Sequence, residues 1–225
     1  MGTDGGQRDV DALVIIGGYL LGSIPTAYLA GRWLKGIDLR EYGSGTVSGT
    51  GIIYHVGLAA GVLAGLFDVA KGALAAWLAL RLGSSLAVGL LAGLAAVIGH
   101  NWPIYLGFKG GRGISAFMGM MLVVFPLGVL WLLLFLAVGR LLKLTALIAF
   151  CGILTLPLLS CVTRQPTAVT LAGIGMLVIT VVKRLEANRL PLPSGPERRQ
   201  VLLHRLFLDR DVGTNEEWVS RRPEG

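Results

Sequence analysis

Long runs of apolar residues constrain this chain more than any other feature of its sequence. Five such runs cover residues 13–30, 58–80, 86–98, 114–138 and 144–162, and none presents a continuous polar face. Only a bilayer suits segments of this kind, because in lipid a helix satisfies its own backbone hydrogen bonds. With 54% hydrophobic and 15% charged residues, the sequence predicts an all-α integral membrane protein and excludes a soluble or secreted domain.

Basic residues at the ends of the apolar segments predict the topology. Clusters follow the first run, the segment near residues 85–106, the run that ends at residue 138 and the last segment near residues 167–182. Cytoplasmic loops of membrane proteins are enriched in Lys and Arg, so an even number of crossings must separate these clusters. We therefore predict about seven transmembrane helices, with the amino terminus outside and the basic loops and the carboxyl terminus in the cytoplasm.

This topology requires the apolar run at residues 114–138 to cross the membrane twice. Pro126 lies near the middle of the run, and a proline breaks a helix because it lacks a backbone N–H and clashes with the preceding turn. We expect two short helices that meet at Pro126. A single long span is the alternative, and it would place Arg140 and Lys143 outside.

The basic charge of the chain, +7 with a pI near 9.8, is explained by its membrane topology. We therefore expect no nucleic-acid partner. His55, His100 and His204 lie far apart without carboxylates or thiols at ligand spacing, so we predict no metal site and no cofactor. Cys151 and Cys161 lie roughly 15 Å apart along one helix and cannot form a disulfide with each other.

Two glycine-rich segments interrupt the apolar pattern, and both fall on the predicted cytoplasmic side. The first, at residues 36–51, interleaves glycines with hydroxyl residues just before an apolar helix. Exposed backbone N–H groups in such a segment form a concave site for phosphate. A flexible loop is the alternative. The candidate substrate-binding positions in this segment are Arg40, Gly43, Ser44, Gly45 and Thr46.

The second segment, at residues 99–113, ends in Lys-Gly-Gly-Arg-Gly before the next apolar run. Two cations around a glycine pair suit a phosphate group at the membrane surface. The spacing of a nucleotide-binding P-loop is absent. A basic anchor for the neighbouring span is the alternative. The candidate site residues here are His100, Asn101, Lys109, Gly110, Gly111, Arg112 and Gly113.

Asp68 and Lys71 lie three residues apart inside an apolar run. Ionisable groups at that depth must pair with each other or line a polar cavity. The sequence leaves open whether they form an internal ion pair or belong to a functional site. Stripes of small residues predict close helix contacts at Gly57, Gly61, Gly65, Gly89 and Gly93.

Together these segments resemble the bacterial acyl-phosphate:glycerol-3-phosphate acyltransferases of the PlsY type. The similarity covers nearly all of residues 13–190. It is carried by Gly-Ser-Ile-Pro at 22–25, Lys-Gly-Ile-Asp-Leu-Arg at 35–40, Gly-Ser-Gly at 43–45, Asp68 with Lys71-Gly72, and residues 99–113. The resemblance implies a multi-pass enzyme of the bacterial inner membrane that acts in phospholipid synthesis. Such an enzyme transfers a fatty acyl group from acyl phosphate to the 1-hydroxyl of glycerol 3-phosphate, giving lysophosphatidate and phosphate.

On matching positions, the resemblance implies catalytic roles for Ser44, His100 and Arg112 and substrate binding by Lys109. Arg112 stands where the family has lysine. Lys143 stands at a family serine position and is a further candidate for binding the substrate phosphate. The chain departs from the family pattern at several polar positions, which are Thr46, Gly51, Tyr54, Lys183 and Glu186.

These departures lead to two hypotheses about function. The first is an acyltransferase with a rebuilt polar site. The second is a catalytically silent relative that binds a lipid phosphate or a partner enzyme without turnover. We expect Glu186 to weaken anion binding in either case, because like charges repel.

Residues 1–190 are predicted to form the transmembrane domain, and residues 191–225 a cytoplasmic Pro-rich linker and amphipathic tail. In the tail, apolar residues recur at helical spacing next to arginines. We expect a short helix that lies on the anionic inner leaflet. A cap over the active site is the alternative. The arginines that the first interpretation assigns to the lipid surface are Arg198, Arg199, Arg205 and Arg210.

Overall fold

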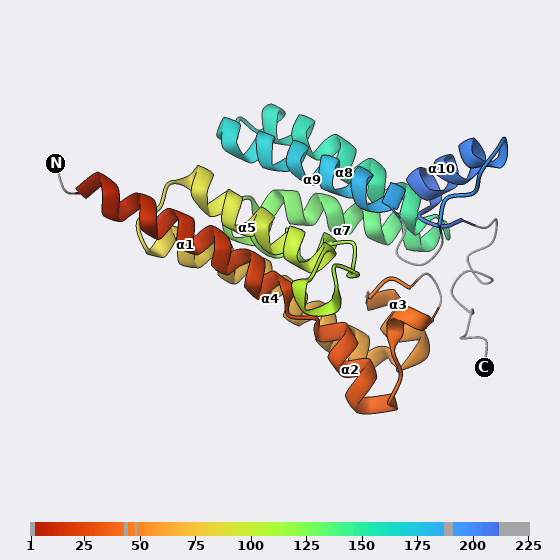
Figure 1. The fold of residues 1–225 in the computed structure, drawn as a ribbon. Coiled ribbons are helices and arrows are strands. Elements are labelled where there is room, and N and C mark those ends of the chain that lie inside the picture. Colours follow the sequence, from red (N-terminus) through yellow and green to blue (C-terminus); the bar gives the residue numbers. More distant parts are fainter. Residues whose placement is uncertain (1–2, 43–44, 48, 187–190, 212–225) are drawn as a thin grey trace.

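All regular elements that the structure describes are helices (Figure 1). The structure, a computed structural model, describes residues 3–42, 45–47, 49–186 and 191–211. The predicted all-α membrane fold is confirmed. The α-helices are α1 (Thr3–Ser23), α2 (Thr26–Lys35), α3 (Gly49–His55), α4 (Leu58–Arg81), α5 (Leu86–Asn101), α6 (Ile114–Val124), α7 (Pro126–Leu141), α8 (Thr145–Val162), α9 (Thr167–Glu186) and α10 (Glu197–Leu208), and two 3₁₀ turns are η1 (Leu39–Glu41) and η2 (Ile104–Leu106).

Five segments of the described chain are long and apolar enough to cross a membrane. They are Gly5–Lys35, Leu58–Arg81, Leu86–Leu106, Thr145–Val162 and Thr167–Glu186.

The remaining apolar run divides at Pro126, as predicted, into α6 and α7. These two helices have 11 and 16 residues, fewer than the ~20 that a helix needs to cross the hydrocarbon. The break is therefore established, while a total of seven crossings stays a prediction.

The core of the bundle lies where α5, α6, α7, α8 and α9 meet. Phe117, Met120 and Met121 of α6 are fully buried there, together with Leu156 of α8 and Met176 of α9. The outer faces carry exposed leucines instead, in keeping with a surface that contacts lipid, since lipid tails are as apolar as leucine. Examples from three helices are Leu63, Leu133 and Leu158.

Glycines allow several very close contacts between helices, and two of these glycines face alanines. A Cβ at Gly22 of α1 would overlap the backbone of Ala96 of α5, and a Cβ at Gly72 of α4 would overlap the backbone of Ala116 of α6. Without side chains between them, the helix backbones can approach closely, as in other membrane bundles. These contacts bring α1, α4, α5 and α6 together beneath the site described below.

The predicted glycine stripes are confirmed only in part. Gly89 and Gly93 pack against neighbouring side chains, and Gly61 packs against Ile53 of α3. The contacts predicted for Gly57 and Gly65 are wrong, because no atom of the described part of the chain lies within 4 Å of a Cβ at either position. A spacing of four residues shows which residues share a helix face, but not which face meets another helix.

We expect Gly22→Ala to lower the thermal stability of the protein. The added methyl group would push α1 away from α5, and such overpacking costs about 1–3 kcal/mol. Gly17→Ala is the matched control, because Gly17 lies on the same helix with nothing within 4 Å of a Cβ. Thermal unfolding in detergent measures both variants, and equal midpoints would contradict the importance of this contact.

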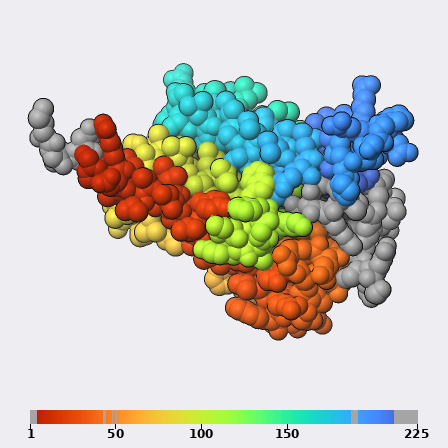
Figure 2. Space-filling model, in the orientation of Figure 1, coloured from red at the N-terminus to blue at the C-terminus, as the bar shows by residue number. Residues whose placement is uncertain are grey.

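The loops that carry the predicted site gather at one end of the bundle. Figure 1 shows α2, α3 and α10 at the end of the molecule opposite the start of α1. In Figure 2 the loop after α5, coloured yellow-green, lies at the surface between the orange α2–α3 region and the blue α9. Segments far apart in the sequence therefore converge around the carboxyl end of α5.

Candidate functional site

The two glycine-rich segments lie against each other at the carboxyl end of α5. The backbone N–H of Val47 donates to the carbonyl of Gly110 at 3.3 Å, and that of Gly111 donates to the carbonyl of His100 at 3.0 Å. A Cβ at Gly111 would overlap the His100 ring. Glycine is therefore required here, because the backbone of one segment touches both the imidazole and the other segment.

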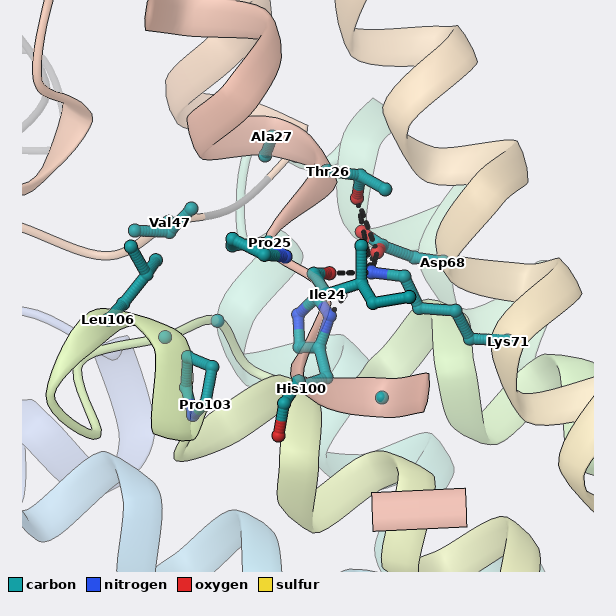
Figure 3. A pocket seen from close by; sticks show the side chains of 14 residues that line it. Ile24, Pro25, Thr26, Ala27, Val47, Asp68, Lys71, His100, Pro103 and Leu106 are labelled. Atoms are coloured by element: carbon teal, nitrogen blue, oxygen red, sulfur yellow. Dashed lines mark hydrogen bonds and ion pairs between the residues drawn. The ribbon is translucent and has the colours of Figure 1, made fainter. Parts of the chain in front are cut away.

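A small pocket opens beside this contact. Residues 22–27, at the junction of α1 and α2, form one wall, and Val47, His100 and Pro103 form another. Figure 3 shows Asp68 and Lys71 on the side opposite Val47, with the His100 ring between them. The pocket thus joins the glycine-rich segments to the ionisable pair inside the membrane helix α4.

Asp68 and Lys71 form a buried ion pair, one of the two alternatives that the sequence left open, and they also line the pocket. Lys71 Nζ lies 2.7 Å from Asp68 Oδ1, donates to Thr26 Oγ1 at 3.2 Å and contacts the Ile24 carbonyl. Thr26 in turn donates to Asp68 at 2.8 Å. Burial of a charge pair is tolerated when further hydrogen bonds satisfy both partners, and the α1–α2 junction supplies them here.

His100 connects this ion pair to the glycine-rich loop. Its Nδ1 lies 3.4 Å from Asp68 Oδ1, while its Nε2 edge faces Gly111. A carboxylate on one ring nitrogen fixes the orientation of an imidazole and of whatever the other nitrogen contacts. The α4 carboxylate therefore holds the ring that supports the loop.

We expect Asp68→Asn to destabilise the protein by about 3–5 kcal/mol, because it leaves Lys71 as an uncompensated buried charge. The double variant Asp68→Asn with Lys71→Met removes that charge and should recover part of the loss. Thermal unfolding of the wild type, both single variants and the double variant gives the coupling between the two positions. Additive losses would contradict a coupled pair.

Arg112 contacts the ends of α9 and α10 and does not line the pocket. Its Nη1 donates to the Lys183 carbonyl at 2.9 Å, and its Nε lies 3.1 Å from the Asp209 carboxylate. Lys183 Nζ lies 5.0 Å from the centre of the Trp102 ring and 3.2 Å from Glu186. Trp102 Nε1 donates to Glu186 at 2.6 Å. We call these five residues the Arg112 cluster.

The Arg112 cluster changes the role expected for Glu186. Its carboxylate is held by the Lys183 ammonium and the Trp102 indole, so its charge is balanced within the protein. From the sequence alone, this carboxylate is predicted to repel an anion. The ion pair with Lys183 offsets that repulsion.

Arg40 is held in an ion pair of its own. Its guanidinium forms three hydrogen bonds of 2.6–3.2 Å with both oxygens of Asp38, and its Cζ lies 5.2 Å from the centre of the Tyr28 ring. The Arg40 side chain lowers the pKa of Asp38 below its usual value. The resulting stabilisation is complete above the ordinary pKa of the carboxyl and is lost as the pH falls through the lowered one.

The remaining predicted residues lie in different surroundings. Asn101 is fully buried, and no hydrogen-bond partner for its side-chain amide lies within the ranges that the structure describes. Its carbonyl oxygen faces the space where a Cβ of Gly113 would lie. Lys109 is exposed, and Lys143 lines a second cavity with Arg210 at the start of α8.

The structure therefore brings the predicted residues together in two neighbouring groups. Val47 brings the first segment to the glycine pair beside His100, whereas Arg112 reaches the second group at the end of α9. Buried positions among the predicted residues that the structure describes are Gly45, Thr46, Asn101, Gly110, Gly111 and Gly113. Gly43 and Ser44 lie outside the residues that the structure describes.

Sequence reasoning missed two residues that contact the site. Trp102 follows Asn101 directly within the second segment, and an aromatic residue with an N–H donor at the edge of a basic segment was a signal that could have been used. No local signal marks Asp209, because it lies 97 residues from Arg112 in the chain.

The predicted tail helix forms as α10, with Arg198 and Arg199 exposed as expected, but the assignment of Arg205 to the lipid surface is wrong. Arg205 is 2% exposed, with its guanidinium bound to Asp211 at 2.5 and 2.9 Å and to the Leu185 carbonyl at 3.2 Å. Phe207 packs edge-on against Phe150 of α8. The Arg205 side chain thus points into the protein, where the Asp211 carboxylate balances its charge and the Leu185 carbonyl accepts a further hydrogen bond. Residues 212–225 of the predicted tail lie outside the described ranges.

Comparison with known sequences identifies relatives along most of the chain. The profile of the family described as glycerol-3-phosphate acyltransferase matches residues 12–190. Glycerol-3-phosphate acyltransferase 4 of Dehalococcoides mccartyi (strain CBDB1) is 37% identical over 219 residues, which cover 93% of each chain. The glycerol-3-phosphate acyltransferase of Synechococcus sp. (strain CC9902) is 41% identical over 188 residues, 83% of this chain and 94% of its own.

Two solved structures share the fold, and both are of PlsY (YgiH), described as an integral membrane glycerol 3-phosphate acyltransferase. The glycerol 3-phosphate form aligns with a TM-score of 0.74 at 28% identity and covers 92% of this chain and 96% of its own. The lysophosphatidic acid form aligns with a TM-score of 0.73 at 26% identity and covers 93% and 97%.

Proposed function

This chain belongs to the glycerol-3-phosphate acyltransferase family, and from that premise we propose how it works. It is a membrane-bound acyltransferase whose acceptor is glycerol 3-phosphate, an activity that serves phospholipid synthesis. The alternative of a catalytically silent relative is not favoured, since named enzymes align along nearly the whole chain. The donor that we propose is acyl phosphate, and the acceptor group is the 1-hydroxyl.

The observation that carries the proposal is the contact between residues 45–47 and 109–113. It places a glycine-rich backbone beside the cations Lys109 and Arg112 at the end of α5. Backbone N–H groups together with an arginine fork are the groups that bind phosphate oxygens in proteins. Each proposed substrate carries a phosphate, so two phosphate groups must be oriented at this end of the bundle.

The chemistry asks little more of the protein than orientation and charge stabilisation. An acyl phosphate is already activated, because phosphate is a good leaving group. The acceptor hydroxyl attacks the acyl carbon, a new C–O ester bond forms, the bond from the acyl carbon to the phosphate oxygen breaks, and the hydroxyl proton leaves with the released phosphate. Holding the reactants in line and balancing the developing charge supply the rate enhancement.

We assign roles to the predicted residues on this basis. Arg112 and Lys109 bind substrate phosphate, with the backbone of the glycine pair between them. Ser44 is proposed to contact the reacting group from the first segment. The geometry of His100 favours a positioning role, because Asp68 holds one edge of its ring and the other edge supports Gly111. Substrate-binding roles for Arg40, Thr46, Asn101 and Lys143 stay predictions.

Purified protein supplied with acyl phosphate and glycerol 3-phosphate should release inorganic phosphate. We expect Arg112→Ala to lower kcat/KM about 10²–10³-fold, the usual cost of losing one donor that stabilises developing charge. Arg112→Lys should recover part of the activity, because it keeps a cation for the phosphate. A colorimetric phosphate assay measures all three proteins.

Arg81→Ala is the matched control for this experiment. Arg81 ends α4 at the turn that leads to α5, where its guanidinium lies 5.4 Å from the centre of the Trp77 ring. The control should turn over at the wild-type rate. No phosphate release by well-folded wild-type protein, or equal activity in Arg112→Ala, would contradict the proposed site.

For localisation, we propose a bacterial inner membrane, with the amino terminus outside and the site loops and the carboxyl terminus in the cytoplasm. The proposal rests on the positive-inside rule and on the basic residues that cluster near the carboxyl end of α5, where the site lies. The residue after Pro126 should then lie outside the cytoplasm, so a reporter enzyme that works only outside the cytoplasm should be active when fused there. A cytoplasmic reporter at that position would contradict the hairpin formed by α6 and α7.

A further inference from the structure

Residues 197–211, which we call the C-terminal strap, are fixed to the transmembrane bundle by buried contacts. The Arg205 guanidinium binds both Asp211 and the Leu185 carbonyl at the end of α9. From the opposite direction, Arg184 of α9 donates to the Leu206 carbonyl at 2.7 Å. The Arg205–Leu185 and Arg184–Leu206 hydrogen bonds therefore join the strap to α9 from both sides. The Arg205 and Arg184 side chains are 2% and 4% exposed. The strap therefore packs as part of the folded protein at the carboxyl end of α9.

In the docked strap, the Asp209 carboxylate forms an ion pair with Arg112, the arginine that we propose binds phosphate. Asp209 follows α10 in a left-handed backbone conformation (φ 56°), and its backbone N–H donates a hydrogen bond to the Arg205 carbonyl at 3.1 Å. This turn puts its side chain 3.1 Å from Arg112 Nε. The Arg112 and Asp209 side chains are only 15% and 22% exposed, so water screens their attraction less than it would at an open surface.

A carboxylate and a phosphate compete for the same groups of an arginine. Both are oxyanions that accept hydrogen bonds from the guanidinium fork. Arg112 Nη1 is already bound to the Lys183 carbonyl, so Nε and its neighbouring nitrogen form the edge that is left for an anion. Asp209 lies at that edge, and a second anion there would be repelled by its charge.

We propose that Asp209 is an internal competitor for the anionic substrate at Arg112, so that the C-terminal strap sets the affinity of the site for phosphate-bearing ligands. This inference rests on the proposed function in one respect, which is that Arg112 binds substrate phosphate. When the substrate phosphate binds Arg112, the Asp209 carboxylate moves off the guanidinium. When the site is empty, Asp209 satisfies a charge that would otherwise lie half-buried without a counter-ion.

Asp209→Asn tests the competition, because asparagine keeps the shape of the side chain and is well tolerated in left-handed backbone. We expect the KM for glycerol 3-phosphate to fall about two- to fivefold, the scale of a partly exposed charge pair, with kcat within twofold of wild type. Glu197→Gln is the matched control, since it removes one negative charge at the exposed start of α10. A KM that is unchanged or raised in Asp209→Asn would overturn the proposal, and a raised value would mean that Asp209 orients Arg112 for binding.

A second measurement does not depend on turnover. Isothermal titration of inorganic phosphate into the purified full chain should show tighter binding to Asp209→Asn than to the wild type or Glu197→Gln. Equal affinities in the three proteins would overturn the competition even if the enzyme is active. A wild type that binds phosphate but never releases it from acyl phosphate would instead contradict the proposed function. Matching unfolding midpoints establish that the variants are folded.

Discussion

The buried ion pair between Asp68 and Lys71 is the interaction on which the rest of the site depends. Two charges inside a membrane helix are costly unless other groups satisfy them, and here the α1–α2 junction and His100 of α5 do so. The ion pair therefore connects α4 to the α1–α2 junction and to the carboxyl end of α5. Because His100 supports Gly111, the charge pair inside the membrane is also connected to the second glycine-rich segment.

Charge balance organises the other half of the site. Two ion pairs lie side by side around Arg112. Lys183 pairs with Glu186 of α9, and Arg112 pairs with Asp209 of the C-terminal strap. A group of cations alone would repel itself in a partly buried place. Internal carboxylates solve that problem in the empty site. They also create a competition that a phosphate substrate must win, so affinity and stability are set by the same residues.

Much of this organisation could be predicted from the sequence, because its signals are local. The break at Pro126 follows from proline chemistry, and residues 99–113 combine glycines and cations in one short segment. Contacts between distant segments could not be predicted in the same way. The Gly22–Ala96 contact depends on which helix faces meet, and the docking of Asp209 on Arg112 depends on how the strap folds back. For the same reason, the sequence could place Glu186 near the site but not identify Lys183 and Trp102 as its partners.

We propose that the two glycine-rich segments and Arg112 together bind the substrate phosphate. An experimental structure of the protein with glycerol 3-phosphate bound tests it most directly. We predict that the phosphate lies within hydrogen-bond distance of Arg112 and of backbone N–H groups in residues 109–113, with the Asp209 carboxylate displaced from the guanidinium. A phosphate bound elsewhere, with Arg112 still paired to Asp209, would contradict this claim.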